Sequence, residues 1–150
     1  LFALFTIFTT IPRATAQTEL ASLFSAEGTV ERQGAGQTSW STATVGAGFG
    51  ERDAVRTGER SRAAVRFTEG YLARLGDRTT LTILALDQRQ RALELNRGQG
   101  YFLSRRTTAL PNVRTPQVSA TVRGTEFAVE VTAERTVLTV LEGAVEASNP

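Results

Sequence analysis

The chain has 150 residues, of which 17 are basic and 15 acidic, so its formal net charge is +2. Every basic residue is arginine, and lysine, histidine, cysteine and methionine are absent. This composition excludes zinc sites built from cysteine or histidine, and it excludes catalysis by a thiol, an imidazole or a lysine amine. We expect no metal or organic cofactor. The small net charge does not indicate a nucleic-acid partner, and the length fits a single domain.

The first sixteen residues have the pattern of a targeting segment. An uncharged apolar run, Leu1–Ile11, is followed by Pro12, Arg13 and the small-residue sequence Ala14-Thr15-Ala16. An apolar core before such a sequence is typical of a secretory signal peptide. We therefore expect a basic n-region upstream, cleavage after Ala16, and a single extracytoplasmic domain, periplasmic or secreted, over residues 17–150. The alternative is a retained membrane anchor, which upstream residues would have to lengthen, because the run is too short to span a bilayer.

Apolar and polar side chains alternate along most of the chain after residue 17. Successive side chains of a strand point to opposite faces, so alternation predicts strands with one apolar face, and glycine pairs such as Glu69-Gly70 predict the turns between them. One short stretch, Thr18–Phe24, has helical spacing, and Gly34–Gly50 is expected to be a long, loosely ordered connection. Strands are expected over residues 27–32, 53–57, 62–67, 71–75, 80–85, 92–95, 100–104, 112–114, 117–123, 125–132, 136–141 and 144–147.

Many short strands separated by glycine turns predict an all-β domain. The succession of strand, turn and strand favours a solenoid-like stack, although no strict repeat is visible. A two-sheet, jelly-roll-like sandwich is the alternative. Most aromatic side chains should be in the core, and Tyr71, beside Gly70, is expected to be the most exposed.

Three blocks of the sequence resemble the FecR domain, an extracytoplasmic module of bacterial envelope proteins. They are Val45–Ile83, Leu93–Phe102 and Val113–Val145, and the third contains the sequences VRGTEF and LEGAV. The resemblance extends over about residues 27–147. One local departure is Arg52, which stands where the family usually has glycine.

The resemblance implies a signalling role. Well-known members bind a sigma factor through a cytoplasmic segment, cross the membrane once, and receive a signal from an outer-membrane iron-siderophore receptor. If residues 1–16 are cleaved, this chain has no contact with a sigma factor, and we expect a solitary exported member.

The motif residues have a structural and a functional interpretation. In the structural one, Asp53 accepts backbone N–H bonds at a turn, Gly124 forms a turn or bulge with positive φ, the Thr125 hydroxyl bonds the backbone, and Phe127 enters the core. In the functional one, Arg123 anchors a partner on that turn, although it could instead pair with Glu126 or Asp53. The motif set is Asp53, Thr57, Gly58, Gly70, Gly76, Arg123, Gly124, Thr125, Phe127 and Gly143.

A series of arginines is the second candidate site. Arg60, Arg62 and Arg66 are expected on one strand face, where they could bind an acidic partner, a phosphate or a sulfated glycan. The alternative is a solvated face balanced by nearby acids, namely Glu51, Glu59 and Glu69.

Carboxylates are the only other chemical candidates. Glu126 and Glu130 share one strand face, as do Glu142 and Glu146. Hydrolysis of a glycoside needs two carboxylates, but on a solvated face they lack the burial that a general acid needs. We therefore predict no catalytic residue, and a hydrolase remains the third alternative.

The first hypothesis is recognition of another envelope protein, an outer-membrane receptor or an inner-membrane regulator, by an edge strand. The second is binding of cell-wall glycan by arginine and aromatic groups.

Overall fold

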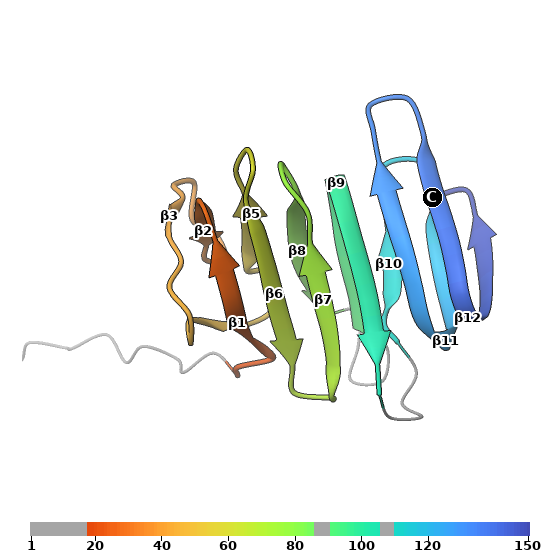
Figure 1. The fold of residues 1–150 in the computed structure, drawn as a ribbon, viewed down its shortest axis with the longest axis horizontal. Helices are drawn as coiled ribbons and strands as arrows, with labels where there is room; N and C mark the ends of the chain where they lie inside the picture. Colours follow the sequence, from red (N-terminus) through yellow and green to blue (C-terminus); the bar gives the residue numbers. More distant parts are fainter. Residues whose placement is uncertain (1–17, 86–90, 106–109) are drawn as a thin grey trace, which may run out of the picture.

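The computed structural model describes residues 18–85, 91–105 and 110–150. Twelve β-strands and no helix occur among these residues, so the all-β prediction is confirmed. Figure 1 shows their arrangement. The strands are β1 Ala21–Glu27, β2 Val30–Gln33, β3 Ser41–Thr42, β4 Gly48–Phe49, β5 Ala54–Thr57, β6 Arg62–Phe67, β7 Tyr71–Leu75, β8 Thr80–Ala85, β9 Arg91–Ser104, β10 Asn112–Arg114, β11 Ser119–Val131 and β12 Thr136–Ser148.

All twelve strands belong to one curled sheet, and β9 is its junction. The order is β3-β2-β5-β8-β9-β7-β6-β1-β4, with β11 and β10 also on β9 and β12 on β11. Residues 91–97 of β9 pair with β8 and β10, whereas residues 98–104 pair with β7 and β11. The sheet therefore folds over along β9, and Figure 1 shows β1, β6, β7, β9, β11 and β12 in front of β2, β5, β8 and β10.

The bend in β9 requires a glycine. Gly98 has a φ of 92°, in the left-handed region, and a Cβ at this position would lie 2.6 Å from the Cα of Thr79. Thr79 is fully buried against it. Only glycine combines this φ with so close a backbone approach at low cost.

The apolar faces of the curled sheet enclose the core. Its largest fully buried side chains include four phenylalanines, one each from β4, β6, β9 and β11. Phe102 stacks on Phe127 with 4.8 Å between ring centroids, and Phe67 stacks on Tyr71 at 4.2 Å. Tyr71 is 3% exposed, so the expectation that it is the most exposed aromatic residue is wrong. Alternation in β7 turns Tyr71, Ala73 and Leu75 inward.

The sheet combines features of both architectures that the sequence suggested. The strands line up along the long axis, as in a stack, and they enclose a core from two sides, as in a sandwich (Figure 1). Among the described strands every pairing is antiparallel except that of β9 with β10, so the stack is a curled sheet without a repeating coil.

Several local predictions differ from the structure. Thr18–Phe24 is not helical, because Ala21 and Leu23 point into the core from strand β1, which has a bulge after Leu23. The stretch Gly34–Gly50 contains the ordered strands β3 and β4. Residues 92–95 and 100–104 form one strand, and 117–123 with 125–132, and 136–141 with 144–147, likewise merge into β11 and β12. The expected signal segment, residues 1–16, lies outside the described residues.

Candidate functional site

Asp53 ties two turns together. The residue is 3% exposed, its Oδ1 accepts a hydrogen bond from the Ala35 N–H, and its Oδ2 accepts one from the Gly50 N–H, both at 2.8 Å. Arg32 Nη2 lies 3.6 Å from the same Oδ2. The carboxylate is thus engaged inside the fold. Arg52, just before it, has a φ of 64°, which is the left-handed conformation that glycine adopts most easily.

The next motif residues connect neighbouring strands. The Thr57 hydroxyl donates to the Gly76 carbonyl at 2.6 Å and accepts from the Thr79 N–H at 2.9 Å. Gly58 packs against Thr29, whose Cβ would lie 3.2 Å from an added Cβ. Gly70, with a φ of 94°, forms the turn between β6 and β7. None of these four motif residues, Thr57, Gly58, Gly70 and Gly76, offers a side chain that a ligand would contact.

A close backbone approach explains the glycines of the β11–β12 hairpin. Gly124 and Gly143 are register partners at an irregularity in the ladder, and an added Cβ on Gly124 would lie 2.8 Å from the Gly143 Cα. The positive φ is at Gly143, at 110°, and not at Gly124 as expected. Phe127 is in the core, but the Thr125 Oγ1 is buried without a hydrogen-bond partner among the described residues, so the expected bond to the backbone is absent. Arg123 is exposed and forms no ion pair with Glu126 or Asp53.

The structure brings together a different arginine set from the predicted one. Arg62 and Arg66 lie exposed on the outer face of β6, as alternation indicates. Arg60 is in the turn before β6, and Arg123 is on β11, opposite Ala144 of β12. Two arginines outside the predicted set, Arg74 of β7 and Arg105 after β9, lie around the same hollow as Arg66. Alternation along β7 could have identified Arg74.

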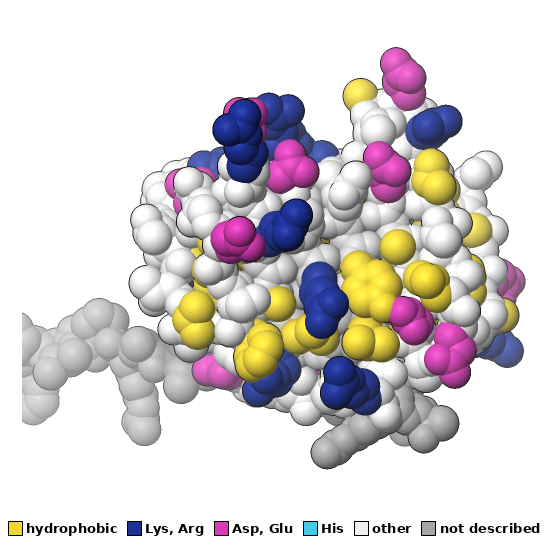
Figure 2. Space-filling view, in the orientation of Figure 1, with side chains coloured by type: hydrophobic (Ala, Val, Ile, Leu, Met, Phe, Trp, Pro, Cys, Tyr) yellow, Lys and Arg dark blue, Asp and Glu magenta, His cyan; other side chains and the backbone are white. Residues whose placement is uncertain are grey.

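That hollow has a volume of about 330 Å³, and we call it the arginine hollow. Figure 2 shows basic and hydrophobic side chains interleaved over β1, β6, β7 and β9, where it lies. The Arg66 guanidinium carbon is 3.8 Å from the centroid of the Phe24 ring, which is 49% exposed. The side chains that define the hollow are Phe24, Arg66, Leu72, Arg74, Leu103 and Arg105.

A second candidate surface is the free side of β12, which we call the open edge. Strand β12 has 13 residues and pairs only with β11 among the described strands. Three of its large apolar side chains are exposed: Val137 by 38%, Val140 by 41% and Leu141 by 56%. At the other end of the sheet, the terminal strands β3 and β4 have only two residues each.

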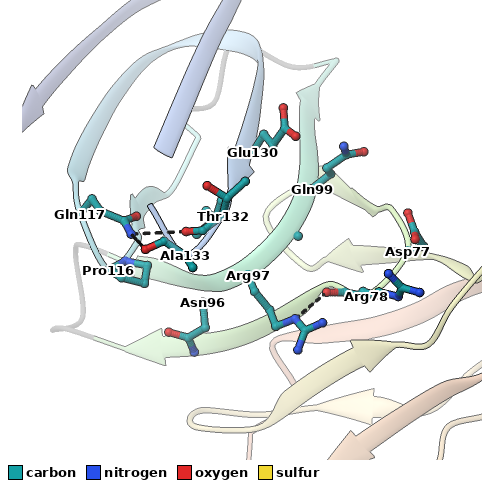
Figure 3. Close-up of a pocket in the computed structure, with 12 residues that line it drawn as sticks. Asp77, Arg78, Asn96, Arg97, Gln99, Pro116, Gln117, Glu130, Thr132 and Ala133 are labelled. Carbon is teal, nitrogen blue, oxygen red and sulfur yellow. Dashed lines mark hydrogen bonds between the residues drawn. The ribbon is translucent and has the colours of Figure 1, made fainter. Parts of the chain in front are cut away.

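A larger pocket, of about 620 Å³, lies beside the bend in β9 (Figure 3). Two of its donors are directed at the surrounding backbone: Arg97 Nε donates to the Arg78 carbonyl at 3.1 Å, and Gln117 Nε2 donates to the Thr132 carbonyl at 3.4 Å. None of the described residues that line it is aromatic. These contacts tie the loops to one another.

The carboxylate candidates lie on the sheet surface. Glu126 and Glu142 are register partners, and Glu130, Glu142 and Glu146 are exposed. The Tyr101 hydroxyl donates a hydrogen bond to Glu126, and this bond raises the pKa of Tyr101. The described residues contain no cluster of three potential metal ligands. Within the same residues, no helix has the length and apolar character to cross a membrane.

Comparison with known proteins identifies the family. The model of the family described as FecR protein matches residues 53–146, which is more than half of the chain. No curated protein and no solved structure matches the chain significantly. The matched range begins at the buried Asp53 and includes both glycines of the β11–β12 hairpin. The resemblance seen in the sequence is therefore confirmed, and the chain belongs to the FecR family.

Proposed function

We propose that this chain is a non-enzymatic, extracytoplasmic module that binds another envelope protein through the open edge of β12. Membership of the FecR family supports a signalling-related module with a protein partner in general. An extracytoplasmic location is supported by the family and by the signal-peptide pattern of residues 1–16. The partner would be an outer-membrane receptor or an inner-membrane regulator, as the family resemblance implies.

The observation that carries this proposal is the character of the open edge. An edge strand presents a row of unpaired N–H and C=O groups, and proteins usually protect it with charged side chains (lysine above all), proline, a bulge or a very short strand. Strand β12 is long, contains no lysine, arginine or proline, and pairs with β11 without a register shift over Thr136–Val140; its two charged residues, Glu142 and Glu146, follow that stretch. Strands β3 and β4 protect the opposite end by being short. A partner that adds a strand here would pair those backbone groups and cover Val137, Val140 and Leu141.

The test compares two single substitutions at opposite ends of the sheet. Residues 17–150 are immobilised as wild type, as Leu141→Lys and as Val45→Lys, and each is exposed to detergent-solubilised envelope and to purified wall glycan. Leu141 is on β12, and Val45 is a similarly exposed residue (62%) of a turn before β4. Both variants should keep the wild-type melting temperature, because neither side chain is buried.

We expect mass spectrometry to identify one envelope protein that is retained by the wild type and by Val45→Lys and is lost from Leu141→Lys. A lysine on the edge strand interferes with strand addition without unfolding the domain. Equal retention of that protein by all three proteins would refute the open edge as the binding site. Retention of wall glycan alone would support the glycan-binding alternative.

A further inference from the structure

Within the part of the chain that the structure describes, some arginines are paired with carboxylates, and others are not. Five form ion pairs with a carboxylate inside the described residues, and they are Arg32, Arg52, Arg56, Arg78 and Arg91. The three arginines of the arginine hollow, Arg66, Arg74 and Arg105, have no carboxylate partner among the described residues. Three cations around one hollow, without a carboxylate partner in the described part of the chain, leave an attraction for anions that these residues do not satisfy.

The register of the sheet places these cations around an apolar floor. Arg66 of β6 is opposite Leu72 of β7, and Leu72 is opposite Leu103 of β9, so the three side chains form one row on the outer face. Arg74 lies in the next row, opposite Tyr101. Leu72 and Leu103 are both partly exposed. An occupant of the hollow would therefore contact apolar surface at its centre and positive charge at its rim.

Aromatic rings orient two of the guanidinium groups. The Arg66 group lies 3.8 Å from the Phe24 centroid, and the Arg74 group lies 6.0 Å from the Tyr101 centroid. A guanidinium that lies flat over a ring leaves its N–H edge for a second partner. That edge fits a carboxylate, which it can bind through two parallel hydrogen bonds.

We propose that the arginine hollow binds an acidic peptide segment, with an apolar side chain against Leu72 and Leu103 and with flanking carboxylates on Arg66, Arg74 and Arg105. This site is separate from the open edge, because it lies over β6, β7 and β9, whereas the edge is the free side of β12. A peptide is favoured over a glycan because Arg66 covers a face of Phe24, on which a sugar ring would stack, and because Tyr71, the other aromatic residue of the lining, is only 3% exposed, whereas Leu72 and Leu103 are partly exposed.

Glu126 limits the site on the β11 side. It is opposite Leu103 in the register, at the end of the row that contains Arg66 and Leu72, and its carboxylate accepts the Tyr101 hydroxyl. This negative charge repels the carboxylates of an acidic peptide, so they are directed toward β6 and β7. Neutralising Glu126 should therefore strengthen binding.

The experiment measures fluorescence anisotropy with a labelled nine-residue peptide of three Asp-Leu-Asp repeats, and with a control peptide in which asparagine replaces aspartate. The proteins are the wild type, Arg66→Gln with Arg74→Gln, and Arg114→Gln. Arg114 serves as the control, because it is exposed, has no ion pair within the described residues and lies on β10, behind the front strands. A fourth variant, Glu126→Gln, keeps an acceptor for the Tyr101 hydroxyl.

We expect the double arginine variant to weaken binding of the aspartate peptide by about tenfold or more, since it removes two charge-assisted contacts. Arg114→Gln should leave the affinity unchanged, and Glu126→Gln should increase it. Salt should weaken binding to the wild type, because the contacts are largely electrostatic. Melting temperatures should be equal, since the substituted arginines are exposed.

Three results would overturn the proposal. The first is equal affinity of the wild type for the aspartate and asparagine peptides, and the second is an equal loss of affinity for the aspartate peptide in the double arginine variant and in Arg114→Gln. The third is binding of polygalacturonate without binding of the aspartate peptide. The third result would assign the hollow to an acidic glycan. Leu141→Lys should not alter peptide binding, so failure of this proposal and failure of the open edge as a binding site are distinguishable.

Discussion

Replacement of Phe127 by alanine tests how the β11–β12 hairpin is held on the rest of the domain. Phe127 is 1% exposed, lies on β11 opposite Phe102 of β9, and stacks on that ring with an interplanar angle of 13°. The pair therefore joins the strand that forms the junction of the sheet to the hairpin that carries the open edge.

The expected loss follows from burial and from the cavity. A fully buried phenylalanine replaced by alanine costs about 3–5 kcal/mol in unfolding free energy, because transfer and cavity terms add. Of this, about 0.5–1.5 kcal/mol belongs to the aromatic pair. Phe127→Leu fills most of the volume and loses the stacking, so it should cost about 1–2 kcal/mol. Because domains have unfolding free energies of about 5–15 kcal/mol, Phe127→Ala should lose a large part of the stability of this domain.

Urea unfolding followed by circular dichroism measures these differences. With a slope of about 1–3 kcal/mol per molar urea, the Phe127→Ala midpoint should fall by roughly 1 M or more. Phe24→Ala is the matched control, since Phe24 is half exposed and contacts Arg66 on the surface; its loss should be about 1 kcal/mol or less. A Phe127→Ala midpoint no lower than that of Phe24→Ala would refute the assignment of Phe127 to the core.

Two further substitutions test backbone strain and a buried hydroxyl. Gly143→Ala should lower the melting temperature more than Gly36→Ala. Both glycines have a positive φ, which costs about 1–3 kcal/mol for alanine. A Cβ at Gly143 would also lie 2.5 Å from the Arg123 carbonyl oxygen, whereas a Cβ at Gly36 would have open space around it. Equal losses of melting temperature in the two variants would show that the backbone of the β11–β12 hairpin moves to accommodate the added Cβ. Tyr71→Phe should not destabilise the protein at neutral pH, because the buried hydroxyl has no partner among the described residues. Burial raises the pKa of Tyr71, so above about pH 10 this tyrosine ionises in the unfolded chain but not in the folded one, and the wild type should lose stability there. The urea midpoint of Tyr71→Phe should fall less than that of the wild type over the same pH range. Parallel plots of midpoint against pH for the two proteins would contradict this.

Local pattern was sufficient to locate the short strands. The alternation from Arg62 to Phe67, the turn at Glu69-Gly70 and the alternation from Tyr71 to Leu75 predict β6 and β7 with the observed bounds. The same reasoning divided β9, β11 and β12, because it read every glycine as a turn. Gly98 and Gly143 instead lie within strands, where they allow a bend or a close backbone approach.

The candidate site depends on register, which a single sequence does not contain. Arg66 and Arg74 come together because β6 pairs with β7, and Leu103 joins them because β7 also pairs with β9. Arg60, Arg62 and Arg66 are close in the sequence, but only the last lines the arginine hollow. Local spacing identified the charged face of β6, and long-range pairing determined which of its arginines share a hollow with other strands.

The two proposed surfaces differ in charge, and this restricts the partner that could occupy both. The β11–β12 hairpin, residues 119–148, contains five glutamates and two arginines, so a strand added at the open edge should carry basic residues. The arginine hollow requires the opposite charge. A partner that presents a basic strand and an acidic segment would bind the first surface and then the second within one complex, where the effective concentration is high. Each surface can then be removed on its own, by Leu141→Lys or by Arg66→Gln with Arg74→Gln, and either change should abolish most of the affinity gained from binding at both surfaces. When all three substitutions are combined, the loss of binding free energy should be smaller than the sum of the separate losses.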